Sequence, residues 1–112
     1  MKEDDFGICP YITAQKLLSG KWTLIVLFLL SNKTMRFSEL QRELPKLTQA
    51  TLTKQLRVLE KDGLIIRTVY NQIPPKVEYS LSDMGERFKP VMKALEAWGN
   101  EYIEFLNEKT QT

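Results

Sequence analysis

The sequence contains no histidine and a single cysteine, Cys9, among its 112 residues. It also lacks a glycine-rich phosphate loop, a cluster of metal ligands and a paired nucleophile and base. Because these are the usual parts of an active site, we expect a protein that is not an enzyme and that binds no cofactor. One cysteine cannot form an intramolecular disulfide, and its isolation suits a reducing cytoplasm.

Long hydrophobic runs are missing as well. The longest apolar stretch, Leu24 to Leu30, has seven residues, whereas a membrane-spanning helix needs about 20. The N-terminal residues MKEDDF are acidic and do not have the pattern of a signal peptide. We therefore expect a cytoplasmic protein with no membrane partner. With 43% hydrophobic residues, the chain suits one domain over residues 1–112.

Net charge is low, at +2, but the charges are unevenly distributed. Residues 33–76 contain nine Lys or Arg against four acids, a net of +5, and residues 77–112 contain four against seven, a net of −3. A basic middle segment beside an acidic end is typical of a protein that binds nucleic acid with one face.

Two short helical patterns meet in residues 38–63. The first begins at Ser38, which stands three residues before Gln41 in the spacing of a capping box. Pro45 removes a backbone donor and ends this helix at about Leu44. The second pattern starts after Thr48 and predicts a helix-turn-helix, in which two helices are joined by a tight turn.

The second helix is expected to have two different faces. Leu52, Leu56 and Leu59 recur as one narrow apolar stripe that can pack on a core. Basic and small side chains lie on the other side: Ala50, Thr53, Lys54, Arg57 and Lys61. This pattern predicts a helix that enters DNA, although an αα-hairpin with a solvated basic surface would show the same pattern.

The following segment favours the DNA-binding interpretation. Residues 64–70 and 76–81 are rich in β-branched and aromatic residues, and residues 71–75 between them end in Pro74 and Pro75. Because two adjacent prolines cannot donate to a strand ladder, they belong at the exposed tip of a β-hairpin. A hairpin directly after a helix-turn-helix makes residues 64–81 the wing of a winged helix.

The segments before residue 38 are predicted to form scaffold. Residues 11–19 predict a short helix, and residues 22–30 predict a second helix that is deeply buried because apolar residues run nearly all round it. Trp22 is expected to pack in the core rather than to bind a ligand. Residues 35–37 are expected to form an edge strand that makes the sheet three-stranded.

The last helix is expected to begin after Ser82, a good N-cap, and to cover about residues 83–106. Its apolar residues recur every three or four positions in a seam longer than a small domain needs: Phe88, Val91, Met92, Leu95, Trp98, Tyr102, Phe105 and Leu106. We expect a second copy of the chain to cover this seam, with the N-terminal helix adding to the interface. The alternative is that the seam folds back on the chain's own first helix.

Several ordered motifs over about residues 9–99 are similar to a known family. They are Cys9-Pro10, Gly20-Lys21-Trp22, Arg36-Phe37-Ser38-Glu39-Leu40, Leu52-Thr53, Gln55-Leu56-Arg57, Leu59-Glu60, Asp62-Gly63-Leu64, Pro74-Pro75, Val77-Glu78-Tyr79-Ser80-Leu81 and Trp98-Gly99. In these motifs the chain resembles the HxlR family of winged helix-turn-helix transcription regulators, which are MarR-like. The resemblance implies an α+β, mainly helical fold with N- and C-terminal dimerisation helices. It also implies a homodimer that binds an inverted-repeat operator in double-stranded DNA and represses or activates transcription.

The residues expected to contact DNA lie on both helices and on the wing. They are Ser38, Gln49, Ala50, Thr51, Thr53, Lys54, Arg57, Arg67 and Lys76. Lys54 and Arg57 can reach guanine edges or phosphates, and the residues near the start of the second helix are placed for base edges. Ser38 and Thr51 could donate to phosphates, but a role as caps or turn residues explains them equally well.

Cys9 has two interpretations. In parts of the resembled family the cysteine of this Cys-Pro motif senses oxidants or electrophiles, so the resemblance allows a redox or small-molecule effector. The only basic residue near Cys9 is Lys2, opposed by three acids, so no feature of the sequence activates the thiol. Packing as a small hydrophobe is the alternative. For the whole chain, the alternative function is a winged-helix module that binds protein and not DNA.

Overall fold

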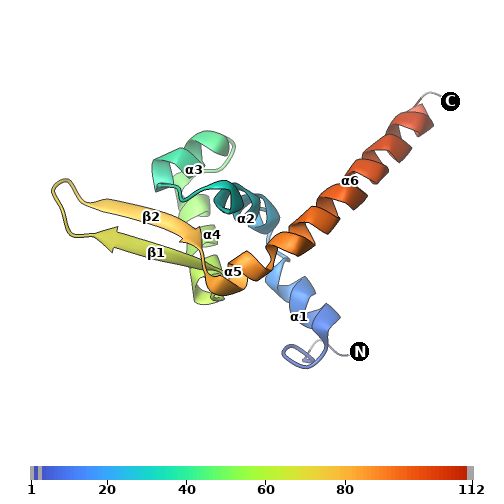
Figure 1. Cartoon of the computed structure of the whole chain (residues 1–112), viewed down its shortest axis with the longest axis horizontal. Coiled ribbons are helices and arrows are strands. Elements are labelled where there is room, and N and C mark those ends of the chain that lie inside the picture. The colour runs from blue at the N-terminus through green and yellow to red at the C-terminus, as the bar shows by residue number, and fades with distance from the viewer. Residues whose placement is uncertain (1, 3, 111–112) are drawn as a thin grey trace.

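The computed structural model describes residues 2 and 4–110. Along the chain the elements are α1 (Pro10–Leu17), α2 (Thr23–Asn32), α3 (Phe37–Glu43), α4 (Gln49–Lys61), β1 (Ile65–Tyr70), β2 (Lys76–Leu81), α5 (Asp83–Arg87) and α6 (Lys89–Thr110). The β-hairpin points away from one side of the body, while α1 and α6 leave it on the opposite side (Figure 1). No helix of the described residues is long and apolar enough to cross a membrane.

The core lies between α2, α3, α4 and the base of the hairpin. Leu52, Leu56 and Leu59 of α4 are at most 1% exposed, so the predicted apolar stripe is confirmed. Trp22 packs against the same core, as expected. The stripe fixes the rotation of α4 about its axis, which in turn directs Lys54 and Arg57 to the outside.

Both ends of α4 are formed as the sequence predicts. The Thr48 Oγ1 accepts a hydrogen bond from the Thr51 backbone N–H at 3.1 Å and caps the helix. At the other end Gly63 has a φ of +79°, a left-handed conformation that glycine adopts without strain. The helix therefore has defined limits at both termini.

The start of α3 differs from the prediction. Arg36, not Ser38, is the N-cap, and its backbone N–H donates to the Glu39 Oε1 at 2.9 Å. Ser38 lies exposed inside the first turn. Gln41 does not reach back to a cap, because its amide donates forward to the carbonyl groups of Leu44 and Leu47. The predicted capping box is therefore wrong, and Gln41 instead holds the turn between α3 and α4.

The hairpin is antiparallel, with Ile65 opposite Leu81 and Tyr70 opposite Lys76. The expected third strand is reduced to one bridge, in which the backbone groups of Met35 and Tyr79 exchange hydrogen bonds of 3.0 and 2.8 Å. The described sheet therefore has two strands, because α3 begins at Phe37 and leaves no room for residues 36 and 37 in a ladder.

α2 is buried on one side only. Val26, Leu27 and Leu30 are at most 4% exposed and point into the core, whereas Ile25 is 45% and Phe28 is 48% exposed. The expectation of a deeply buried helix is therefore wrong for half of its circumference. The exposed half faces the beginning of α6.

The predicted helix over residues 83–106 is divided in two. Ser82 caps α5 by accepting from the Gly85 N–H, as expected, but α5 ends at Arg87, with Phe88 as its C-cap. Pro90 has no N–H to donate to the carbonyl group of Glu86, so the helix is interrupted there and α6 starts with Pro90 in its first turn. α6 then continues past the expected end, to Thr110.

Candidate nucleic-acid interface

The outward face of α4 is basic and open. A shallow hollow of about 500 Å³ runs along it, lined by Ala50, Thr53, Lys54, Arg57, Val58 and Lys61. Lys54, Arg57 and Lys61 are exposed, and none of them forms an ion pair with another described residue. Their positive charges are therefore available to an external anion.

Two glutamines that the sequence analysis did not single out for DNA binding position this helix. Gln41 fixes the turn that precedes α4, and Gln55 donates from its Nε2 to the Thr23 Oγ1 at 3.1 Å, which ties α4 to α2. Thr23 is only 2% exposed. The sequence does contain a signal for Gln55. A polar residue beside the leucine stripe of an amphipathic helix lies at the edge of the core and needs a hydrogen-bond partner there.

The other residues expected to contact DNA near the starts of the two helices are accessible. Gln49 and Ala50 are exposed in the first turn of α4, and Ser38 is exposed on α3. The Thr48 Oγ1 donates to the Thr51 Oγ1 at 2.9 Å, so the Thr51 hydroxyl belongs to the cap of α4 while it also faces solvent.

The hairpin places its two predicted DNA contacts on opposite faces. In the observed register Arg67 lies opposite Tyr79 and shares a face with Ile65, which is the face that packs toward α4. Lys76 alternates onto the other face. The structure therefore brings Arg67 close to α4 and does not bring Lys76 together with Arg67.

Lys76 is engaged within the hairpin. Its Nζ lies 3.7 Å from the Glu78 Oε2 and 4.8 Å from the ring centroid of Tyr70. A hydrogen bond from the Tyr70 hydroxyl to Glu78 raises the pKa of Tyr70. The charge of Lys76 is therefore partly balanced before any ligand approaches.

A second, smaller hollow separates α4 from the hairpin. It has a volume of about 400 Å³, and its lining residues are Thr53, Leu56, Arg57, Glu60, Arg67 and Tyr79. Arg57 lines both hollows, so it stands at the boundary between the outer face of α4 and the space beside the hairpin.

The seam on α6 is uncovered. Leu95 is 38% exposed and Trp98 is 64% exposed, so the seam is not folded back on α1. Phe88 and Met92 differ from the others because they pack against the core. The remaining exposed members are Val91, Tyr102, Phe105 and Leu106.

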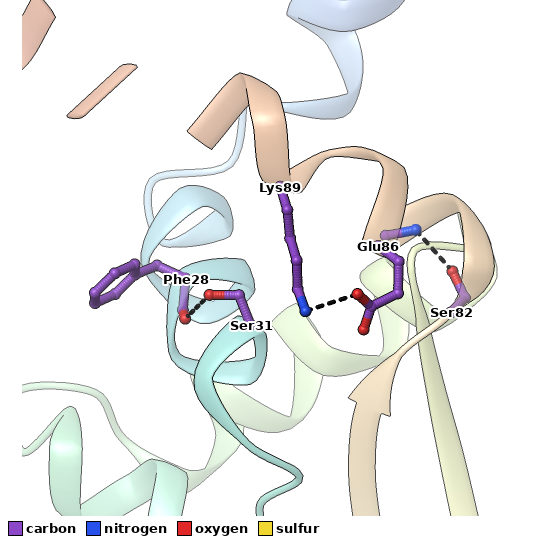
Figure 2. A network of polar contacts seen from close by, with 6 residues as sticks. Phe28, Ser31, Ser82, Glu86 and Lys89 are labelled. Atoms are coloured by element: carbon purple, nitrogen blue, oxygen red, sulfur yellow. Dashed lines mark hydrogen bonds and ion pairs between the residues drawn. The ribbon is translucent and has the colours of Figure 1, made fainter. Parts of the chain in front are cut away.

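An apolar groove continues from this seam to α2. It has a volume of about 780 Å³, and its lining residues include Leu24, Ile25, Phe28, Met92 and Leu95. Lys89 extends from the start of α6 to Glu86, with an Nζ to Oε2 distance of 2.7 Å, beside Phe28 and Ser31 of α2 (Figure 2).

A capped basic second helix, a turn held by Gln41 and a β-hairpin wing together define a winged helix-turn-helix DNA-binding domain. Residues 17–107 match the family model described as HxlR-like helix-turn-helix, and the chain belongs to this family. The expected α+β, mainly helical winged helix-turn-helix fold is thereby confirmed.

Known relatives support the same assignment. The chain is 48% identical over 105 residues to the HTH-type transcriptional regulator YdeP of Bacillus subtilis, covering 94% of this chain and 82% of YdeP. It is 45% identical to the regulator YkvN of the same organism, covering 86% of this chain and 81% of YkvN. These relatives are transcriptional regulators, so the chain is a transcriptional regulator and not an enzyme.

Solved structures agree with this fold. The regulator YtcD superposes with a TM-score of 0.82 at 43% identity, over 87% of this chain and 99% of YtcD. The redox regulator HypR in its reduced form gives a TM-score of 0.83 at 38% identity, over 89% of this chain and 99% of HypR. A regulator of the MarR family from Porphyromonas gingivalis gives 0.78 at 34% identity, over 84% and 92% of the two chains.

Proposed function

We propose that the chain binds double-stranded DNA sequence-specifically as a homodimer on an inverted-repeat operator. The observation that carries this proposal is the exposed basic face of α4, on which Lys54, Arg57 and Lys61 have no ion-pair partner in the described part of the chain. A surface of unpaired cations on a helix of this fold suits the major groove, whose phosphates and guanine edges accept hydrogen bonds.

Each predicted contact has a place in this proposal. Lys54 and Arg57 reach guanine edges or phosphates, and Gln49, Ala50 and Thr53 approach base edges near the start of α4. Ser38 and Thr51 donate to phosphates. On the wing, Arg67 and Lys76 approach the DNA backbone from different faces of the hairpin, and Lys76 must give up part of its contact with Glu78 to do so.

The homodimer is proposed from the exposed seam of α6. Trp98, Tyr102 and Phe105 form a row with ring-centroid distances of 5.8 and 5.5 Å along the helix, and all three are exposed. A continuous aromatic surface of this kind is unfavourable in water and is normally covered by a partner. α1 leaves the body on the same side as α6, which suits a shared interface (Figure 1).

The test is selection of bound fragments from random double-stranded DNA by the purified chain. We expect an inverted repeat whose half-site centres lie about one helical turn, roughly 34–36 Å, or a multiple of it apart. We also expect affinity for the selected DNA to fall steeply with salt. If no DNA shows salt-sensitive binding, the proposal is wrong and the protein-binding winged-helix module is favoured.

A response of Cys9 to oxidants is a second candidate property. Cys9 is half-buried at the N-cap of α1, so its thiol is not sealed in the core. HypR is described as a redox regulator, and the regulator YodB has been solved in reduced and diamide-treated forms. Because the sequence has one cysteine, oxidation by diamide would join the Cys9 sulfurs of two subunits, with loss of two protons and two electrons to diamide.

Non-reducing electrophoresis after diamide treatment tests this candidate, with Cys9→Ser as the control. A diamide-dependent dimer band in the wild type, together with a change in operator affinity, supports it. Operator affinity that diamide does not change would indicate that Cys9 only packs.

A further inference from the structure

We propose that the hollow between α4 and the hairpin binds one phosphate of the DNA strand that passes between the recognition helix and the wing. Arg57 and Arg67 are the two ligands of this phosphate, and Glu60 weakens the site by its negative charge. This inference rests on the proposed function, because it assumes that α4 occupies the major groove.

The hairpin directs Arg67 toward α4. The hairpin register places Arg67 on the same face as Ile65 and directly opposite Tyr79, and both of these residues are buried on the side toward α4. Beyond the core the same face continues as the wall of the hollow, where Arg67 is exposed. Its guanidinium is therefore directed to the space beside α4 and not to the outer face of the wing.

The charges that line the hollow favour an anion. Arg57 and Arg67 line one hollow of about 400 Å³, and neither has an ion-pair partner within residues 2 and 4–110. Glu60 also lines the hollow and is likewise without a cation partner in these residues. With two guanidinium groups and one carboxylate, the lining of the hollow keeps a net positive charge. This suits a bound anion, because guanidinium is a fork of donors that matches phosphate oxygens.

The path of the DNA in the proposed complex brings a phosphate to this hollow. When a recognition helix lies in the major groove and a wing reaches toward the adjacent minor groove, the sugar–phosphate strand that separates the two grooves must cross between them. In this molecule the hollow occupies that position, because α4 forms one wall and β1 with β2 forms the other. The anion that the two arginines meet there is thus a backbone phosphate.

In this arrangement Arg57 contacts a backbone phosphate and does not serve base recognition alone. Since Arg57 lines both the outer hollow of α4 and the hollow beside the hairpin, its guanidinium can turn to either. A phosphate held jointly with Arg67 would position α4 in the groove and leave sequence selection to Lys54 and the residues of the first turn.

The experiment uses the full chain and its selected operator, with each phosphate replaced in turn by an uncharged methylphosphonate. We expect one position in each half-site at which the replacement weakens binding by about tenfold, or ~1.4 kcal/mol. On unmodified DNA, Arg57→Ala and Arg67→Ala should each weaken binding by about the same factor. On DNA with the methylphosphonate at that position, either substitution should cost less than about twofold, because the anion they share is gone.

Two further variants sharpen the test. Glu60→Gln should tighten binding to unmodified DNA by roughly threefold and leave binding to the methylphosphonate DNA unchanged, because removing the carboxylate matters only where a phosphate is present. Arg87→Ala on α5 is the matched control. It removes an exposed arginine that does not line the hollow, and it should change affinity less than about twofold.

The outcomes separate the two proposals. If the wild type binds its operator but Arg57→Ala and Arg67→Ala lose as much affinity on every methylphosphonate DNA as on unmodified DNA, the shared phosphate site is wrong and the DNA-binding function stands. If the wild type binds no DNA, the proposed function itself is wrong. Circular dichroism melting of each variant confirms that a loss of binding does not come from unfolding.

Discussion

Gly85 of α5 lies directly against the carbonyl oxygen of Leu64, which precedes β1. A methyl group on Gly85 would overlap this oxygen and would also touch the Leu81 side chain at 3.2 Å. Ser82 strengthens the same junction, because its Oγ donates to the Gly63 carbonyl at 2.6 Å and accepts from the Gly85 N–H. The end of the wing, the end of α4 and the beginning of α5 therefore meet at one closely packed point.

We expect Gly85→Ala to destabilise the protein by about 1–3 kcal/mol, because the backbone of residue 64 must move to admit a methyl group. Urea unfolding followed by circular dichroism measures this change. Gly99→Ala is the comparison, since Gly99 lies within α6 and a methyl group there meets nothing within 4 Å. Alanine at residue 99 should be neutral or stabilising by up to ~1 kcal/mol. Equal effects of the two substitutions would contradict the close contact at Gly85.

A second prediction concerns the hydrogen bond between Gln55 and Thr23. Thr23→Val keeps the shape of the side chain but leaves the Gln55 amide without its acceptor, which should cost about 1–3 kcal/mol. Replacing both partners, with Thr23→Val and Gln55→Leu, should recover much of this loss. Denaturant unfolding of the two single variants and the double variant gives the coupling energy. A neutral Thr23→Val would show that the bond does not fix α4 on α2.

A third prediction follows from the N-terminal end of α3. The hydrogen bond from the Arg36 backbone N–H holds the pKa of Glu39 below its ordinary value, and Lys33 at 3.7 Å acts in the same direction. A carboxylate with a lowered folded-state pKa stabilises the protein above its unfolded pKa, and this stabilisation is lost as pH falls through the folded pKa. Wild type should therefore be more stable than Glu39→Gln at neutral pH, with a difference that shrinks in acid.

Urea unfolding of both proteins from neutral to acidic pH measures this difference. Glu43→Gln is the control, because Glu43 is exposed on the same helix and makes no ion pair with the residues that the structure describes. The stability of Glu43→Gln relative to wild type should change less with pH than that of Glu39→Gln. A Glu39→Gln difference that stays constant through acid would show that the carboxylate does not cap α3.

A fourth prediction concerns the proposed dimer. Trp98→Asp places a charge in the exposed aromatic row of α6 and should convert the dimer to a monomer, because a buried unpaired charge is strongly unfavourable in an interface. Asn100→Asp adds the same charge at an exposed position on the opposite side of the helix and should leave the dimer intact. Sedimentation equilibrium distinguishes the two. A Trp98→Asp protein that remains dimeric would place the interface elsewhere.

The parts of the fold that the sequence predicts well depend on local patterns. The leucine stripe with Thr48 and Gly63 located α4 within a residue, and the alternation around Pro74 and Pro75 located both strands. In each case the residues that define the element lie within it or next to it in sequence. The pattern of one helix or one hairpin is therefore enough to predict its hydrogen bonds and its buried face.

The parts that the sequence predicts poorly depend on competition between possible hydrogen bonds or on contacts with residues that are distant in sequence. Ser38 had the form of a cap, but Glu39 reached the Arg36 N–H and shifted the helix start. The interruption before α6 has a local signal in Pro90, which lacks the N–H that would continue the helical hydrogen bonds. The exposed half of α2 had no local signal, because an apolar helix looks the same whether a core or a neighbouring surface covers it.

The candidate site also has one part that follows from local spacing and one part that depends on contacts distant in sequence. The basic face of α4 follows from helical spacing alone, whereas the position of Arg67 beside Arg57 depends on the register of the hairpin and on which of its faces packs toward α4. A shift of one residue in that register would turn Arg67 to the outer face. The composition of the wing therefore predicts a contact with DNA but does not predict that Arg67 lies beside Arg57.

The break between α5 and α6 at Phe88 affects which half-site spacing the proposed dimer can recognise. In the proposed dimer the two recognition helices are connected through the α6 helices of their subunits. The angle between the two α4 helices then depends on the break where α5 ends at Arg87 and α6 begins at Lys89. The separation of the two half-sites is then encoded some thirty residues away from any side chain that touches a base. Related chains with the same α4 could read the same half-site at a different spacing simply by changing the direction in which α6 departs.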